Sequence, residues 1–180
     1  KTVCRTVSHL VDLIEQGWRL VISHGNGPQV GFILRRSEIS ESEVDPVPVD
    51  YAVADTQGAI GYMFVKALTN ELARRGLKNP VVAIVTQSVV DPADEAFKNP
   101  TKPIGPFYTR DVAERYRDLF DWVIVEDSSR GYRRVVSSPE PKAIIELDAI
   151  QACVERGLVV IAGGGGGIPV FNDHDLSKGV

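Results

Sequence analysis

Residues 16–31 read QGWRLVISHGNGPQVG and combine the end of a helix, a buried strand and a glycine-rich turn. Upstream of Gly17, apolar residues recur at helical spacing over residues 3–14. Glycine commonly ends a helix because it adopts the left-handed conformation without steric cost. A strand is predicted at once over residues 19–23, with an apolar centre at 20–22, and it leads into His24–Gly31, in which Pro28 is suited to the first turn of a further helix. This order predicts one helix–strand unit of an α/β fold.

The same order of helical stripe, glycine and apolar strand occurs twice more in the chain. The two copies are residues 60–72 with Gly76 and 81–85, and residues 150–154 with Gly157 and 158–162. All three strands are continuous Val/Ile/Leu runs without polar alternation, which is typical of a parallel sheet covered by helices on both faces. We therefore predict an α/β sandwich.

Composition excludes several other classes of protein. The chain has 180 residues, of which 43% are hydrophobic and 24% charged, so we expect one ordinary globular domain and not a disordered, collagen-like or coiled-coil chain. The longest apolar runs are far shorter than the ~20 residues of a membrane helix. The net charge of −4 comes with no basic tract. We expect a soluble cytoplasmic protein with no nucleic-acid or membrane partner.

The cysteines and histidines do not predict a metal site. Cys4 and Cys153 lie in amphipathic segments far from one another, so we interpret them as small buried apolar residues. His9, His24 and His174 are too scattered to form a ligand set. His24 adjoins the glycine turn, where it contacts a ligand or simply caps the strand end.

A region of different character lies between the second and third units. Residues 91–141 are rich in proline and charge, and residues 122–126 and 132–136 flank a turn-like segment, which predicts a hairpin. We interpret this region as a small subdomain inserted in the sheet. The acidic, proline-containing stretch 38–48 is expected to be a solvated surface loop.

The turn after the first strand is a candidate anion-binding site. Glycines at positions 25 and 27 let a ligand approach the backbone around Asn26, and a helix begins directly afterwards. Unpaired N–H groups and the helix dipole converge at such a point. A tight turn without any ligand is an equally good interpretation of the turn alone. The spacing matches neither the dinucleotide fingerprint nor the P-loop, so both of these nucleotide motifs are excluded.

The second glycine-rich turn is the run Gly163–Gly167. A flexible linker is the alternative, but linkers have polar flanks and this run lies between apolar strand residues. Ligands bind at the carboxyl ends of parallel strands in open α/β sheets. The turns after the first and third strands are therefore expected to form one phosphate-sized cradle.

Lys102 is the candidate catalytic residue. It stands between Pro100 and Pro103, so we expect a loop of restricted geometry that presents its ammonium group. An ammonium aimed at a transferring phosphoryl group is a recurrent catalytic device. From the spacing alone, an exposed surface lysine is the better interpretation. The nearby acidic residues 91, 94 and 95 are expected to form a solvated turn, and the chain contains no serine nucleophile elbow.

Taken together, these segments closely resemble carbamate kinase, a member of the amino acid kinase superfamily. The matching segments are HGNGPQVG (24–31), TQGAIGY (56–62), DPADEAFKNPTKPIGPF (91–107), YRRVV (132–136) with Ser138–Pro139, and GGGGIPV (164–170). The resemblance covers essentially the whole chain in order. The long segment 91–107 is specific to carbamate kinase, which disfavours another amino acid kinase such as one acting on N-acetylglutamate.

The resemblance implies an open three-layer α/β/α sandwich with a mainly parallel sheet, usually assembled as a homodimer. It implies reversible phosphoryl transfer between ATP and carbamate, giving carbamoyl phosphate and ADP, with Mg²⁺. Gly25, Asn26 and Gly27 would line the carbamate and transferred-phosphate site, Gly164, Gly165, Gly166 and Gly167 would bind substrate or phosphate, and Lys102 would reach over them. The predicted insertion 91–141 corresponds to the protruding subdomain of that family.

The resemblance also implies an expectation about the extent of the chain. Family members begin with a strand ending in Gly-Gly-Asn and continue into a nucleotide-binding part with an Asp-Lys-Asp motif, and neither is found in residues 1–180. We expect these residues to be the N-terminal, phosphoryl-acceptor part of an amino acid kinase domain. The alternative is a catalytically inactive fragment, or an anion-binding or dimerisation module that lacks the nucleotide site.

Overall fold

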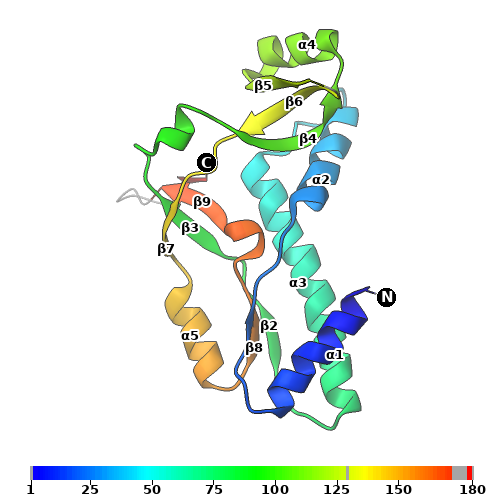
Figure 1. The fold of residues 1–180 in the computed structure, drawn as a ribbon, viewed down its shortest axis with the longest axis vertical. Coiled ribbons are helices and arrows are strands. Elements are labelled where there is room, and N and C mark those ends of the chain that lie inside the picture. Colours follow the sequence, from blue (N-terminus) through cyan, green and yellow to red (C-terminus); the bar gives the residue numbers. More distant parts are fainter. Residues whose placement is uncertain (1, 129, 172–177, 180) are drawn as a thin grey trace. The chain divides into compact units, whose positions relative to one another are not determined.

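The computed structural model describes residues 2–128, 130–171 and 178–179 (Figure 1). His174 and the side chain of Cys4 lie outside the described set. The helices are α1 (Thr2–Glu15), α2 (Gly27–Ile39), α3 (Val49–Arg74), α4 (Arg110–Phe120) and α5 (Leu147–Glu155), with 3-10 turns η1 (Glu95–Phe97) and η2 (Gly164–Gly166). The strands are β1 (Val21–Ile22), β2 (Val81–Ala83), β3 (Gln87–Val90), β4 (Lys102–Tyr108), β5 (Ile124–Asp127), β6 (Gly131–Val136), β7 (Pro141–Ile144), β8 (Val159–Ile161), β9 (Ile168–Phe171) and β10 (Lys178–Gly179).

The chain divides into two compact units. The first unit contains Lys1–Asn26, Val53–Ser88 and Ala143–Ile168, and the second contains Gly27–Ala52, Val89–Lys142 and Pro169–Val180. The chain crosses from one unit to the other five times, and three of these crossings fall within β3, β7 and β9. The predicted subdomain 91–141 falls inside the second unit, so its limits as a separate domain stay a prediction.

The first unit is built on a parallel sheet with the order β1-β8-β2. The register pairs Val21 with Val160 on one side and Val82 with Val160 on the other, so β8 is the central strand. All three strands are those predicted from the apolar runs, although each is shorter than its run. The glycines predicted to end the preceding helices, Gly17, Gly76 and Gly157, all have positive φ. The predicted α/β fold is confirmed.

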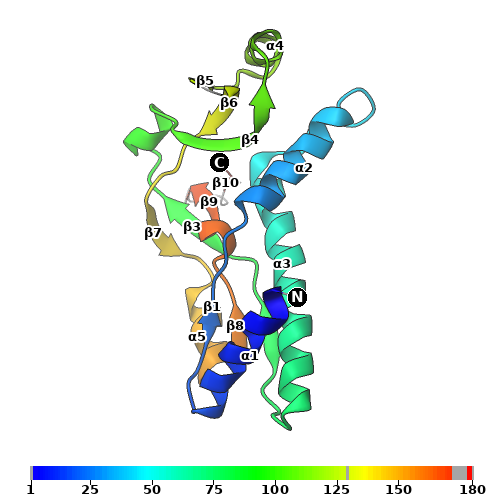
Figure 2. The same cartoon turned by 45° about the vertical axis from the view of Figure 1, so that its right-hand side comes forward.

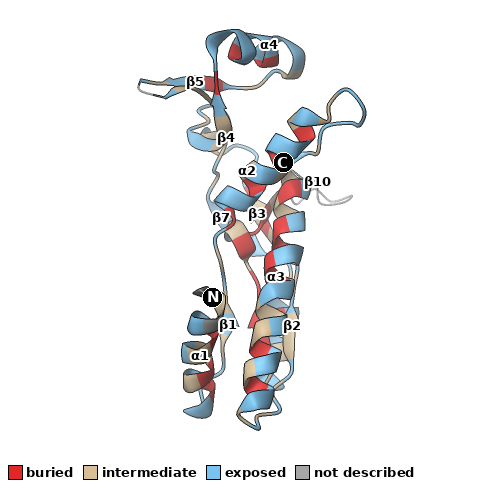
Figure 3. Cartoon of the chain, turned by 90° about the vertical axis from the view of Figure 1, so that its right-hand side faces the viewer, coloured by how far each residue is buried: buried red, intermediate tan, exposed pale blue. Residues whose placement is uncertain are grey.

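Alternate residues of β8 face different helices, which produces the three layers. Val159 and Ile161 pack with buried residues of α1 and α3, whereas Val160 packs with Ile150 of α5. Figure 2 shows α5 on one side of β8 and α3 on the other. The buried residues of α1 form a single stripe along the helix (Figure 3). A strand apolar on both faces therefore follows from its central position between two helical layers.

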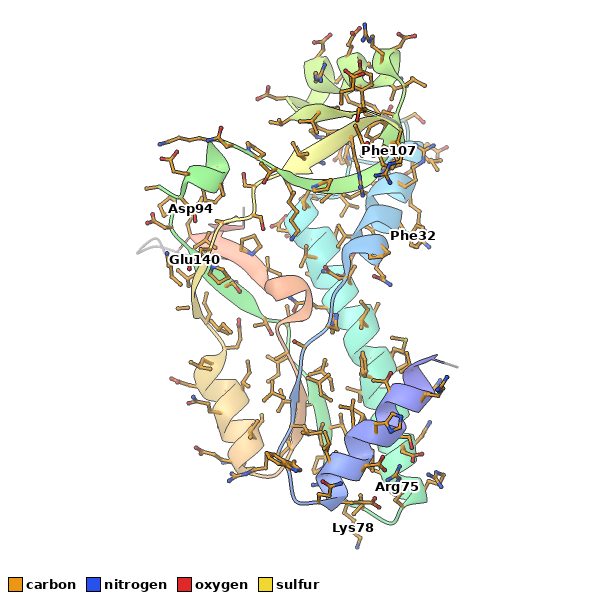
Figure 4. All side chains as sticks on the ribbon, in the orientation of Figure 1. Phe32, Arg75, Lys78, Asp94, Phe107 and Glu140 are labelled. Atoms are coloured by element: carbon orange, nitrogen blue, oxygen red, sulfur yellow. The ribbon has the colours of Figure 1, made fainter. Side chains whose placement is uncertain are left out.

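An ion cluster joins α1 to the end of α3. The Arg75 guanidinium, shown in Figure 4, donates to Asp12 Oδ1 at 2.6 Å, Glu15 Oε2 at 2.8 Å, Glu71 Oε1 at 2.8 Å and the Ser8 carbonyl at 3.0 Å. Its side chain is only 14% exposed. Hydrogen bonds from Arg74 and Arg75 lower the pKa of the Glu71 carboxyl to about 2, and the Arg75 bond lowers that of Asp12.

The second unit is built on the antiparallel sheet β4-β6-β5. The predicted hairpin is confirmed as β5 and β6, with Ile124 paired to Arg134. One face of this sheet packs on α4 through a mainly aromatic cluster, whose buried and partly buried members are Tyr108, Ala113, Tyr116, Phe120, Trp122, Ile124 and Tyr132. The Arg134 guanidinium lies 4.0 Å from the centre of the Trp122 ring. The pKa of Arg134 is lowered because its charge is desolvated.

Two predictions for this unit are wrong. Lys102 does not lie in a loop but begins β4, paired with Val136. β4 is an edge strand, where proline is tolerated because no neighbour on the free side needs its N–H. The stretch 38–48 is not wholly a solvated loop, since α2 continues to Ile39 and the Glu38 side chain is only 5% exposed. Its carboxylate accepts a hydrogen bond from the Tyr108 hydroxyl.

Among the described residues, no helix combines the length and apolar composition that crossing a bilayer requires.

Leu68→Ala tests the layer packing of the first unit. Leu68 is 0% exposed in the cluster between α1, α3 and β8, so the truncation leaves a cavity. We expect the free energy of unfolding to fall by about 2–5 kcal/mol, measured by urea denaturation. Leu119→Ala, at a position 59% exposed on α4, should cost less than about 0.5 kcal/mol. Equal losses would contradict the assignment of the core.

Arg75→Met tests the ion cluster through pH. A carboxyl whose pKa is lower in the folded than in the unfolded chain adds stability above its unfolded value of about 4, and that stability is lost as the pH falls toward the folded value. The wild type should therefore exceed the variant in melting temperature by a few degrees at neutral pH. This difference should shrink below about pH 4. A difference independent of pH would show that Arg75 acts only through packing.

Candidate functional site

The first unit brings the two predicted glycine turns together at the carboxyl ends of β1 and β8. The Gly165 N–H donates to the His24 carbonyl at 2.8 Å. The Asn26 and His24 side chains pack directly on the glycine run. Gly25, Asn26 and the run Gly163–Gly167 thus share one edge of the parallel sheet, as expected from strand order. Gly27 follows in the chain as the first residue of α2, in the second unit.

Packing requires the glycines of the second turn. A Cβ on Gly165 would collide with the Asn26 carboxamide, and one on Gly167 would collide with the Ser88 hydroxyl. At Gly164, a Cβ would lie 2.6 Å from the His24 imidazole. Gly165 and Gly167 also have φ of 67° and 88°, which other residues rarely adopt. The run is therefore not a flexible linker.

Most amides of this turn donate within the protein. Gly163 N–H donates to Thr86 Oγ1 at 2.9 Å, Gly166 N–H to the Gly163 carbonyl at 3.0 Å and Gly167 N–H to the Gly164 carbonyl at 3.2 Å. With Gly165 bound to His24, only the Gly164 N–H of the run lacks an acceptor in the described part of the chain. Within the described residues, the run therefore offers one amide without an acceptor and a surface without side chains, and the predicted phosphate-sized cradle stays a prediction.

The amides of Gly27 and Gln29, at the start of α2, are donors without an acceptor among the described residues. The first N–H groups of any helix have no intrahelical partner. Asn26 precedes α2 and is a residue type that often caps a helix, but its side chain is directed elsewhere, since Nδ2 donates to Thr56 Oγ1 at 2.9 Å. No described side chain accepts a hydrogen bond from the first-turn amides of α2. Such an end attracts an anion through its amides and its dipole.

Lys102 belongs to the second unit together with α2. Its place over the glycine turns stays a prediction, because the turns lie in the first unit. Within the second unit, α2 is fixed to β4 by the hydrogen bond from Tyr108 to Glu38, and a Cβ on Gly31 of α2 would lie 3.9 Å from Gly105 Cα. Burial of its hydroxyl and the hydrogen bond to Glu38 raise the pKa of Tyr108. Tyr108 therefore stays neutral and donates at physiological pH.

The acidic turn near Lys102 has a structural role. The Asp94 carboxylate accepts hydrogen bonds from the Ala96 N–H at 2.8 Å and the Glu140 N–H at 3.0 Å. Asp94 and Glu140 are labelled in Figure 4. These backbone hydrogen bonds lower the pKa of the Asp94 carboxyl. Among the described residues, no group of three or more His, Cys, Asp or Glu side chains is placed to hold a metal ion. Cys153 is free and half-buried against Ile150 and Val160.

Sequence reasoning missed three polar residues that hold the second glycine turn. Gln57 donates to the Gly164 carbonyl, Thr86 accepts from Gly163 N–H, and Ser88 Oγ donates to the Gly166 carbonyl at 2.7 Å. Thr86 directly follows the second apolar run, past the carboxyl end of the parallel strand β2, and Ser88 lies two residues further on in β3. Their position after a parallel strand, where ligand sites commonly form, could have indicated Thr86 and Ser88 but not Gln57.

No family model matches the chain, but similar proteins are found both by sequence and by structure. The carbamate kinase of Pyrococcus horikoshii is 47% identical, over 100% of this chain and 58% of that protein. The chain is a homologue of carbamate kinase. Carbamate kinase 1 of Enterococcus faecium is 48% identical over 97% of the chain and 56% of its own length.

Solved carbamate kinase structures share the fold. The carbamate kinase from Giardia lamblia bound to AMP-PNP matches with a TM-score of 0.92 and 36% identity, over 99% of this chain and 57% of that one. The chain thus spans between 56% and 58% of the length of these carbamate kinases. The match over nearly the whole chain confirms the resemblance inferred from the sequence motifs.

A pair of glycine substitutions tests the packing of the turn. Gly165→Ala and Gly166→Ala both place alanine at positive φ, at a cost of roughly 1–2 kcal/mol. Only the first also collides with Asn26, since a Cβ on Gly166 meets nothing within 4 Å. We expect Gly165→Ala to lower the free energy of unfolding more than Gly166→Ala, measured by urea denaturation. Equal losses would show that Asn26 does not pack on the turn.

Proposed function

We propose that the protein containing this chain is a carbamate kinase, which transfers a phosphoryl group reversibly between ATP and carbamate. The observation that carries the proposal is the 47% identity to the Pyrococcus horikoshii carbamate kinase over the whole chain. The AMP-PNP complex of the Giardia lamblia enzyme supports ATP as the phosphoryl donor. A cytoplasmic location and a homodimeric assembly are part of the proposal.

In this reaction a carbamate oxygen attacks the γ-phosphorus of ATP. The new P–O bond gives carbamoyl phosphate, and the bond to the β-phosphate breaks to release ADP, with no proton gained or lost. Phosphoryl transfer requires little covalent chemistry from the protein, which mainly positions the reactants and neutralises charge. The backbone amides of the glycine turns and the proposed ammonium of Lys102 suit that requirement.

The proposed roles follow from the chemistry of each group. Gly25, Asn26 and Gly27 would hold carbamate and the transferred phosphoryl group beside the free amides at the start of α2. In Gly164–Gly167, the Gly164 N–H would donate, and the absence of side chains would leave room for the anion. Lys102 would bring its ammonium to the equatorial oxygens, where charge is spread in the transition state.

Mg²⁺ usually accompanies ATP and is held largely by phosphate oxygens and water. The described residues contain no cluster of carboxylates for this ion. Mg²⁺ is therefore proposed as part of the nucleotide complex.

Lys102→Ala tests the assigned catalytic role. Loss of one transition-state donor should lower the rate of ATP formation from carbamoyl phosphate and MgADP by roughly 10²-fold or more, with the circular dichroism spectrum unchanged. The matched control is Lys98→Ala, because Lys98 is an exposed lysine of the same segment that pairs with Glu95 at 2.6 Å. Near-normal activity of Lys102→Ala would rule out its role. A wild-type protein that forms no ATP would overturn the proposed function itself.

A further inference from the structure

Gln57 of α3 lies at the centre of the polar contacts beneath the glycine turn. The residue is only 4% exposed. Its Nε2 donates to the Gly164 carbonyl at 3.0 Å and to the Thr86 carbonyl at 3.1 Å, and its Oε1 accepts from the Thr86 N–H at 2.7 Å. Both amide hydrogens and the carbonyl oxygen of the side chain are therefore used. All of these groups belong to the first unit.

The chemistry of these contacts requires a carboxamide. Both acceptors of Nε2 are backbone carbonyls, so a carboxylate in its place would face two oxygens and donate nothing. An aliphatic side chain would leave the buried Gly164 and Thr86 carbonyls each without one hydrogen-bond donor. The loss of these hydrogen bonds would lower the free energy of unfolding. No side chain of similar size other than glutamine both donates twice and accepts once.

Gln57 holds the turn in two ways, by a direct hydrogen bond and through Thr86. Directly, it fixes the peptide between Gly164 and Gly165, whose N–H on the other side donates to His24. Through Thr86, it holds the residue that accepts from Gly163 N–H and, by its own carbonyl, from Ile168 N–H at 2.9 Å. The one amide of the run that has no described acceptor, Gly164 N–H, lies between these fixed points.

We infer that Gln57 is a positioning residue, which orients the Gly164 amide and the glycine turn for the phosphoryl group without touching it. This inference rests on the proposed function. A misplacement of about 1 Å in such a site costs on the order of 10²-fold in rate. Because the effect is on orientation in the transition state, it should appear mainly in kcat and less in KM.

The test compares Gln57→Glu and Gln57→Met in the full-length protein, assayed for ATP formation from carbamoyl phosphate and MgADP. Both variants should lower kcat by roughly 10- to 10²-fold. Burial next to two carbonyl oxygens raises the pKa of an introduced carboxyl, and its acid form donates one hydrogen bond. The kcat of Gln57→Glu relative to wild type should therefore rise from about pH 8 to about pH 6, whereas that of Gln57→Met should not change.

Two further variants make the test specific. Gln151→Glu is the matched control, since Gln151 is an exposed glutamine of α5, and its kcat should equal that of the wild type at each pH. Ser88→Ala removes one hydrogen bond to the same turn and should lower kcat in the same direction by a smaller factor. It also serves if a Gln57 variant does not fold. A ratio for Gln57→Glu that does not change with pH, or unchanged kcat in the Gln57 and Ser88 variants, would overturn the inference.

Amide hydrogen exchange separates this inference from the proposed function. If Gln57 holds the turn, Gln57→Met should raise the exchange rates of the Gly165 and Ile168 amides, and Gln151→Glu should not. This readout needs neither substrate nor turnover. If the wild type forms no ATP but amide exchange is faster in Gln57→Met, the proposed function is refuted. Gln57 would still be shown to fix the conformation of the turn. Unchanged exchange would overturn the inference whether or not the protein is active.

Discussion

The close approach of the glycine run to His24, Asn26 and Ser88 is the constraint on which the rest of the site depends. At three positions of the run, any Cβ would meet one of these side chains at a distance that real structures do not show. The turns after β1 and β8 can pack this closely because this backbone has no side chains. Contacts within the protein are thus sufficient to require glycine at these positions. A ligand that binds the same surface would be an additional reason for it.

The sheet explains why these segments meet. β8 is the central strand of its parallel sheet, so residues after β8 and residues after β1 necessarily emerge at the same edge. The helices on both faces fix the strands through buried apolar residues, among them Leu68 on one face of β8 and Val160 on the other. The ion cluster of Arg75 closes the opposite end of the same layers. Rigidity at the strands allows the irregular backbone after them to keep one conformation.

The strands, the helices before them and the hairpin could be predicted from the sequence. The signals for them, glycines at helix ends and the spacing of apolar residues, depend on local chemistry alone. The sequence did not predict that Lys102 lies in a strand, since three nearby prolines oppose pairing unless the strand is at an edge. Nor did it predict the burial of Glu38. An acidic residue is buried only where a specific donor binds it, and the donor here, Tyr108, is distant in the sequence. Most contacts of Gln57 were equally hidden, because they join residues that are far apart in the chain.

The central position of β8 also has a consequence for synthesis on the ribosome. In the part of the chain that the structure describes, β1 and β2 do not pair with each other, and each pairs with β8, which is made last of the three. Until residues 159–161 have left the exit tunnel, the backbone N–H and C=O groups of both earlier strands lack this partner. Both strands therefore lack this partner throughout the synthesis of residues 84–158, which is the period in which a chaperone that shields extended apolar segments would have the greatest effect.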